Sequence, residues 1–232
     1  MAAVTIEGML AIEARAIASG WTEEALLDLA GQRLGRAIGR FFPTPGTAVG
    51  YLGKGHNAGD ALVALGILRD EFGWNIAVRC GFPMIECAPL TGKKWRELGA
   101  PKPLDEAPKP TDSRDPFILL DGLLGSGSKG RLREPLISLA VEMAALRQNH
   151  GARIAAVDLP SGMDADSGTC FENAVIADVT FMIANPKSGL LFGHAANVTG
   201  ALVLVPVEPL TSENSCDMEL IAPQTMNFGK AP

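Results

Sequence analysis

Three glycine-rich stretches, each directly after an apolar run, constrain the fold of this chain more than any other feature. They cover residues 53–60 (GKGHNAGD), 125–130 (GSGSKG) and 158–164 (DLPSGMD). In a parallel sheet, the loops that follow the carboxyl ends of the strands meet in one crevice. The loops contribute an amide, hydroxyls, lysines and aspartates, which suit phosphate groups, hydroxyl groups and a cation. The three stretches therefore predict one site for an anionic small molecule.

Helical and strand patterns alternate along the chain, and this alternation sets the fold class. The apolar periodicity predicts helices over residues 8–19, 23–41, 59–71, 89–98 and 135–148, and strands over residues 47–52, 75–80, 117–120, 153–157, 179–184 and 201–207. Strands that alternate with helices form right-handed βαβ units, so we expect an α/β fold with a mostly parallel sheet between helical layers. The two leading helices are expected to pack on this core or on a partner subunit.

The predicted domain covers residues 1–207. Its first helix carries Leu10, Ala14 and Ile17 at helical spacing, which predicts an apolar stripe. Residues 208–232 lose all periodicity, and we expect them to form a tail or linker.

Composition excludes several classes of partner. A formal net charge of −6 provides no basic face for a nucleic-acid backbone. No apolar run approaches the roughly 18 residues of a membrane span, and Glu7, Glu13 and Arg15 interrupt any signal-peptide core. The 4 cysteines are widely spaced, without a Cys-x-x-Cys pair, so reduced thiols in a cytoplasmic protein are expected rather than a zinc site.

The first loop matches the glycine pattern of dinucleotide-binding proteins, because Gly53-x-Gly55-x-x-Ala58 lies between a strand and a helix. Such a fold usually places an acidic residue at the end of the second strand to bind a ribose. Arg79 stands there instead, and it either contacts a phosphate or has a structural role. Asn57 can bind a cation or a hydroxyl group, whereas Asp60 is either functional or a helix cap.

The second and third loops follow strands that end in aspartates, Asp121 and Asp158. The positions of these carboxylates indicate a functional role, because binding residues gather at the carboxyl ends of parallel strands. Lys129 lies between glycines where it can meet a phosphate. Ser161 offers an oxygen to a hydroxyl group or a cation. It does not lie in a Gly-x-Ser-x-Gly nucleophile elbow, which excludes a hydrolase of that type.

The order of these motifs resembles the YjeF N-terminal domain family, the NAD(P)H-hydrate epimerases. The segments that match are 27–31 (LDLAG), 55–60 (GHNAGD), 121–130 (DGLLGSGSKG) with 133–135 (REP), 157–164 (VDLPSGMD) and 185–190 (NPKSGL). The resemblance implies a three-layer αβα, Rossmann-like domain that equilibrates the R and S epimers of hydrated NADH or NADPH (NAD(P)HX). It also implies a homodimer and fusion to, or association with, an ADP- or ATP-dependent dehydratase, to which the tail at 208–232 would lead.

The same resemblance assigns roles to residues of the three loops. It implies a potassium ion bound by Asn57, Asp121 and Ser161, whose hard oxygen atoms suit such a cation. The implied substrate-binding set is His56, Asn57, Ala58, Gly59, Asp60, Gly125, Ser126, Gly127, Ser128, Lys129, Gly130, Arg131 and Asp158. Asp158 is the candidate general acid and base, since its loop can tune the pKa of a carboxyl group.

Two alternatives stay open beside the epimerase. The family's Gly-Asn-Asn-Gly-Gly-Asp-Gly segment is altered here at His56, Ala58 and Ala61, where two added methyl groups stand in place of glycines. These changes leave catalytic competence open and motivate a binding module without turnover, for a nucleotide or a protein. A redox enzyme that binds NAD(P) at the first loop is the third possibility, and the missing acidic ribose ligand disfavours it.

Overall fold

The computed structural model describes residues 3–110, 115–211 and 219–221, with side chains up to residue 211. A single sheet has the strand order β2-β1-β3-β4-β5-β6-β7, parallel throughout except that β7 runs antiparallel to β6. The strands are β1 (Thr47–Leu52), β2 (Asn75–Cys80), β3 (Phe117–Gly122), β4 (Arg153–Val157), β5 (Val179–Ile183), β6 (Ala201–Val205) and β7 (Glu219–Ile221). The helices are α1 (Ile6–Ala18), α2 (Glu23–Phe41), α3 (His56–Phe72), α4 (Pro89–Glu97), α5 (Leu136–His150) and α6 (Ala196–Thr199).

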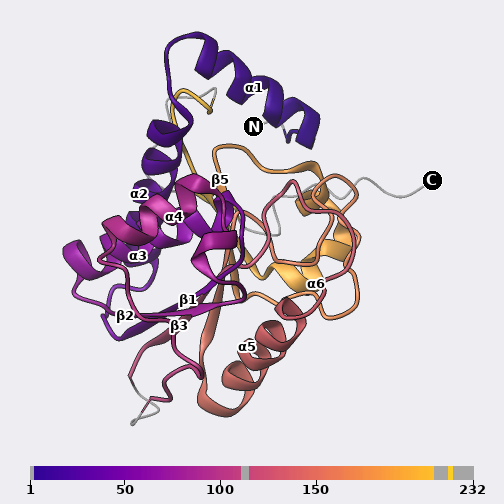
Figure 1. Ribbon diagram of the computed structural model, residues 1–232. Coiled ribbons are helices and arrows are strands. Elements are labelled where there is room, and N and C mark those ends of the chain that lie inside the picture. Colours follow the sequence, from indigo (N-terminus) through magenta and orange to yellow (C-terminus); the bar gives the residue numbers. More distant parts are fainter. Residues whose placement is uncertain (1–2, 111–114, 212–218, 222–232) are drawn as a thin grey trace.

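Helices cover both faces of this sheet, which confirms the predicted three-layer α/β fold. Helices α2, α3 and α4 lie on one face and α5 lies on the other (Figure 1). Strands β3 and β5 are buried along their whole length, as expected for parallel strands covered on both sides. The sheet has a topological switch point between β1 and β3, because β2 lies on one side of β1 and the later strands lie on the other. In open α/β sheets, ligands bind in the crevice at such a point.

A row of glycines on α2 sets how closely α3 approaches it. A Cβ added at Gly31, Gly35 or Gly39 would come within 2.5–2.7 Å of a side-chain carbon of α3. Real Cβ atoms do not approach this closely, so the two helices pack with almost no space between them at these positions. This contact positions α3, whose first turn contributes to the site described below.

Helix α3 begins at His56, three residues earlier than predicted. Gly55 is its N-cap, with an extended backbone at φ −87° and ψ −174°. Residues 56–60 are therefore the first turns of a helix rather than a glycine loop. The helical pattern could not show this, because polar His56 and Asn57 precede the apolar periodicity that marks the helix.

Helix α1 differs from its prediction in the direction of its apolar side chains. Leu10 and Ile17 are 60% and 43% exposed, and Ala14 is exposed as well, whereas Met9 and Ala16 are buried. The helix stands out from the layers at the edge of the sheet (Figure 1). Backbone hydrogen bonds fix the chain before it, since Val4 N donates to Pro186 O (2.9 Å) and Ser188 N donates to Val4 O (2.9 Å). Helix α1 thus contributes Met9 and Ala16 to the core, while Leu10 and Ile17 line a cavity.

The sheet continues past residue 207, where the predicted domain ends. Leu210 and Thr211 are buried, and the Thr211 hydroxyl donates to Ala184 O (2.9 Å). The backbone at β7 then adds the last strand. Most of the predicted tail, 208–232, lies outside the described residues, and the division at 207 stays a prediction. In the part of the chain that the structure describes, no helix combines the length and the apolar character needed to cross a bilayer.

Candidate functional site

A cavity of about 570 Å³ opens at the carboxyl ends of four neighbouring strands, β1, β3, β4 and β5. The segments after these strands form one side of it, and α1 with the start of α2 forms the other. The residues that line it from the strand side are Gly55, His56, Asn57, Asp60, Gly125, Ser126, Gly127, Ser128, Asp158, Ile183 and Lys187. The structure thus brings the three predicted loops together at a single cavity.

Some residues of the predicted substrate-binding set lie elsewhere. Lys129, Gly130 and Arg131 are not among the residues that line the cavity. Ala58 and Gly59 are buried on the side of α3 that packs away from it, and an added Cβ at Gly59 would lie 2.9 Å from Leu27 Cδ1. The Ala58 side chain and the backbone of Gly59 therefore contribute to helix packing.

The two alanines of the first segment do not narrow the cavity. The side chains of Ala58 and Ala61 are fully buried in the core on the α2–α3 face of the sheet. Ala61 also packs against β3, since a Cβ added at Gly122 would lie 2.9 Å from Ala61 Cβ. The added methyl groups fill space between α3 and its neighbours. Of the three altered positions, only His56 lines the cavity.

The predicted cation ligands come together around the backbone of one residue, Leu124. Its carbonyl oxygen accepts a hydrogen bond from Asn57 Nδ2 (2.9 Å), and its N–H donates to Ser161 Oγ (2.9 Å). The Ser161 hydroxyl in turn donates to Asp121 Oδ1 (2.6 Å), and Ser161 N donates to Asp121 Oδ2 (2.8 Å). Segments after β1, β3 and β4 are thereby linked through one small network.

The chemistry of this network suits a hard cation. Asp121 is completely buried, and among the described residues no lysine or arginine forms an ion pair with it. Burial raises the pKa of the Asp121 carboxyl group to about 6, although hydrogen bonds from Ser161 oppose the shift. A bound cation would balance this buried charge, and carboxylate, amide and hydroxyl oxygens are the ligands that hard cations prefer.

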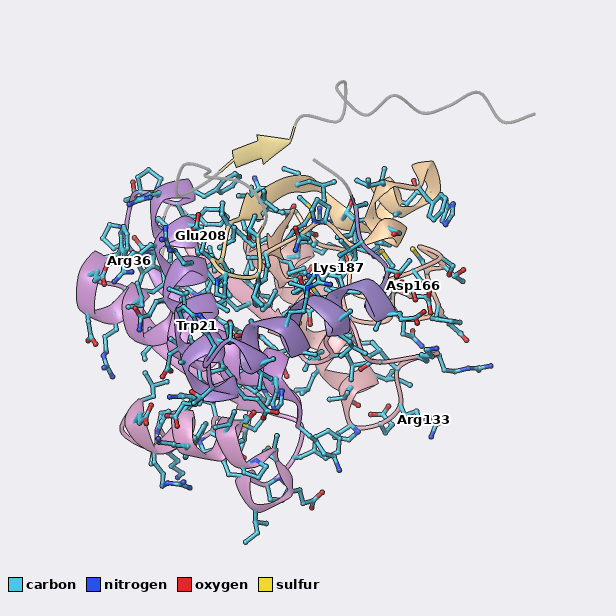
Figure 2. The ribbon with its side chains drawn as sticks, turned by 90° about the horizontal axis from the view of Figure 1, so that it is seen from above. Trp21, Arg36, Arg133, Asp166, Lys187 and Glu208 are labelled. Atoms are coloured by element: carbon cyan, nitrogen blue, oxygen red, sulfur yellow. The ribbon has the colours of Figure 1, made fainter. Side chains whose placement is uncertain are left out.

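Asp158 forms a buried ion pair with Lys187, a residue absent from the predicted site. Lys187 Nζ contacts Asp158 Oδ1 and also donates to Ile183 O (2.8 Å), while Ile183 N donates to the same carboxylate oxygen (3.1 Å). Asp158 is only 7% exposed and Lys187 only 2%. Figure 2 shows Lys187 beside α1 near the middle of this side of the molecule. The 185–190 motif contains Lys187, but spacing gave no sign that its side chain reaches the third loop.

The backbone of Asp158 is unusual for a residue other than glycine. Its φ of 69° lies in the left-handed region, which asparagine and aspartate tolerate better than other residues. The turn aims the carboxylate into the cavity at the end of β4. Strain of this kind gathers at functional sites, where the surrounding structure maintains it.

Three further carboxyl groups face the cavity, Glu13 from α1, Glu23 from α2 and Asp60 from α3. Burial raises the pKa of Glu13, and the nearby Asp158 charge adds to the rise while Lys187 opposes it. Burial and the charge of Asp158 together hold the pKa of Asp60 well above its usual range. Sequence reasoning missed Glu13, because it lies far from the glycine segments along the chain.

Arg79, the alternative phosphate ligand, has a structural role. Its guanidinium donates to Glu142 Oε1 (2.9 Å) and to Leu104 O (2.6 Å), and the Tyr51 hydroxyl donates to the same Glu142 oxygen (2.7 Å). These contacts hold the Arg79 guanidinium group away from the cavity, which Arg79 does not line. Among the described residues, no acidic residue or arginine at the end of β2 lines the cavity, where a dinucleotide-dependent redox enzyme usually has its ribose ligand.

The sequence matches a family model described as YjeF-related protein N-terminus over residues 23–189. It is 33% identical over 89% of its length to a bifunctional NAD(P)H-hydrate repair enzyme, Nnr, of Thermosynechococcus vestitus, and 34% identical over 72% of its length to Nnr of Archaeoglobus fulgidus. The chain spans 40% and 33% of the lengths of these two relatives. Its fold is similar to the crystal structure of yeast ynu0, with a TM-score of 0.77, 20% identity, and coverage of 95% of this chain and 100% of the other.

Proposed function

Because the chain belongs to the family of YjeF-related protein N-termini, we propose that it is an NAD(P)H-hydrate epimerase. It would interconvert the R and S epimers of hydrated NADH and NADPH as a step of nicotinamide-nucleotide repair. The observation that supports this most directly is the cavity in which four strand ends place Asp158, Lys187 and the glycine segments around one space.

The two ends of the substrate need different surroundings, and the cavity offers both. The glycine-rich segment 125–128 and the start of α3 supply backbone N–H groups and the positive end of a helix dipole for pyrophosphate. Lys129 and Arg131 follow that segment, outside the cavity lining, where they can add positive charge for the phosphates. Asp158 and Lys187 face the space left for the hydrated ring.

Asp158 is proposed as the acid and base of the reaction. The hydrated ring has a hydroxyl group on the carbon next to its nitrogen, and inversion requires a proton to be given to that oxygen and taken from it. The carboxylate is oriented by Ile183 and Lys187, and such orientation is what proton transfer by a side chain requires.

A potassium ion is proposed between Asn57, Asp121 and Ser161, where the donor set suits it. When bound, it supplies positive charge that orders the segments after β1, β3 and β4. The same network of hydrogen bonds through Leu124 supports this role, because it links these three segments already. We also propose a homodimer, a cytoplasmic location and cooperation with an ADP- or ATP-dependent dehydratase. The dehydratase is proposed because the relatives are named bifunctional repair enzymes.

The experiment that tests the function follows interconversion of the two epimers by chromatography with purified protein. We expect interconversion well above the spontaneous rate, and Asp158→Asn should lower the rate about 100-fold or more. Asparagine tolerates the left-handed backbone of this position, but it leaves buried Lys187 without its anionic partner, so circular dichroism must first show that the variant is folded. Asp70→Asn, which removes an exposed carboxylate at the far end of α3, should keep the wild-type rate. Interconversion no faster than the spontaneous rate would refute the proposal.

The alternative of a binding module without turnover rests on His56, Ala58 and Ala61. Burial of both alanine methyl groups in helix packing leaves His56 as its remaining support. This alternative predicts that hydrated or intact cofactor raises the melting temperature of the protein without any epimerisation.

A further inference from the structure

The cavity holds more carboxyl groups than its basic groups can neutralise. Its titratable residues are Glu13 from α1, Glu23 from α2, His56 and Asp60 from α3, Asp158 after β4, and Lys187 after β5. Lys187 forms its ion pair with Asp158. Among the residues that the structure describes, no basic side chain forms an ion pair with Asp60.

Asp60 and Asp158 reach the cavity from different elements. Asp60 lies on the second turn of α3, which packs tightly against α2, and Asp158 lies in the turn after β4. The two carboxyl groups therefore reach the cavity from elements that are separate in the sequence. Two carboxyl groups that share one site cannot both ionise easily, and the one with the basic partner keeps its charge more readily.

We propose that Asp60 is the second proton-transfer residue of the cavity, acting from α3 while Asp158 acts from the end of β4. This inference rests on the proposed epimerase activity. Inversion at one carbon requires a hydroxyl group to leave one face and to return on the other. Two separately positioned carboxyl groups can serve those two events, whereas one group would have to serve both faces.

The proton and electron balance of this step is complete with water as the co-reactant. The protonated carboxyl group gives its proton to the ring hydroxyl, the carbon–oxygen bond breaks with its electron pair on oxygen, and water leaves. The lone pair of the ring nitrogen forms a carbon–nitrogen double bond, which gives an iminium cation. Water then adds to the other face of that carbon, and its extra proton passes to the ionised carboxyl group. The opposite epimer reacts with the two roles exchanged.

The charge of the cavity suits this route. An iminium cation carries positive charge that the substrate lacks. The Asp158 carboxylate, paired with Lys187, faces the space where it would form, and Asp60 becomes negative as it gives up its proton. Negative groups that are already in place when positive charge develops lower the barrier without reorganisation. The raised pKa of Asp60 agrees with the same assignment, because a carboxyl group must hold a proton at neutral pH to act as the acid.

The test compares Asp60→Asn with wild type and with Asp70→Asn, a matched change on the same helix outside the cavity. The rate of epimerisation is measured from about pH 5 to pH 9, with the spontaneous rate subtracted. We expect Asp60→Asn to lose about 100-fold in kcat while KM changes little. We also expect the wild-type rate to fall at high pH as Asp60 ionises, and the residual rate of Asp60→Asn should not show this fall. Asp70→Asn should match the wild type in both respects.

The outcomes separate this inference from the proposed function. An active wild type with an equally active Asp60→Asn, or with an unchanged pH profile, would overturn the role of Asp60 alone. A wild type without activity would overturn the epimerase itself. Carboxyl carbon-13 NMR of the wild type gives a readout independent of activity, in which Asp60 should titrate well above Asp70; titration of both groups in the same range would contradict the proposal.

Discussion

At the scale of single residues, Asp121 couples the stability of the protein to pH and to cations. Its pKa is raised to about 6 by burial, whereas an aspartate in the unfolded chain has a pKa near 3.9. Without a cation, ionisation of Asp121 therefore lowers the free energy of unfolding. This loss is absent below about pH 4, grows between about pH 4 and pH 6, and stays constant above that range. A cation bound beside the carboxylate should remove most of this cost.

We therefore predict that potassium stabilises the protein more at pH 8 than at pH 5. The melting temperature should rise by several degrees at pH 8 when potassium chloride replaces choline chloride at equal ionic strength, and by less at pH 5, because each kcal/mol shifts Tm by about 2–4 °C in a protein of this size. Asp121→Asn should lose this pH dependence. An equal gain at both pH values would contradict the assignment of Asp121 as a ligand.

Single residues also show how far the site could be foreseen. Asp121 and Asp158 were predicted because each stands where an apolar strand ends, whereas Asn57 and Ser161 were assigned as cation ligands by their positions in the family motifs. The structure places all four at adjacent strand ends. Lys187 was missed as a site residue because only the folded chain brings it to Asp158, across 29 residues of sequence. Local patterns report which residue follows a strand, but they do not report which side chains meet across a sheet.

At the scale of helices and strands, the contact between α2 and α3 depends on glycines. We predict that Gly35→Ala lowers the free energy of unfolding by about 1–3 kcal/mol, because the added Cβ would lie 2.7 Å from Ile67 Cβ and 2.8 Å from Ala64 O. Urea denaturation measures the change. Gly66→Ala on α3 is the matched control. Its Cβ would meet only Leu98 Cδ1 at 3.5 Å, so better helix propensity should leave it neutral or stabilised. Equal losses in both variants would refute this explanation.

The same elements show why the fold was easier to predict than its details. Strands such as β3 and β5 are mostly apolar along their length, and this pattern predicts a strand that is buried on both faces of a parallel sheet. The exposed stripe of α1 was harder, because Leu10 and Ile17 satisfy helical periodicity whether they face a core or a cavity. The early start of α3 depends on the backbone of Gly55, which apolar periodicity does not report.

At the scale of the whole molecule, the first described residues of the chain bind the segments that follow β4 and β5. Val4 pairs with Lys187, and Ile6 N donates to Asp166 Oδ1 (2.8 Å). We predict that Val4→Pro, which removes the N–H that donates to Pro186 O, speeds hydrogen exchange in α1 and raises KM, while exchange in β3 and β4 stays slow. Val4→Ala keeps this N–H and should behave as the wild type. Unchanged exchange in α1 after Val4→Pro would show that other contacts fix this helix.

The bond between Ile6 and Asp166 joins residues 160 positions apart in the sequence. A ribosome that adds about 5–20 residues each second would need roughly ten to thirty seconds to make the chain between them. During that interval the segment that leads into α1 has no partner, although β1, α3 and β3 can already pair and pack. The cavity would thus be closed only late in synthesis, and a nascent chain that paused before Asp166 would expose Met9, which is buried in the complete structure, to chaperones.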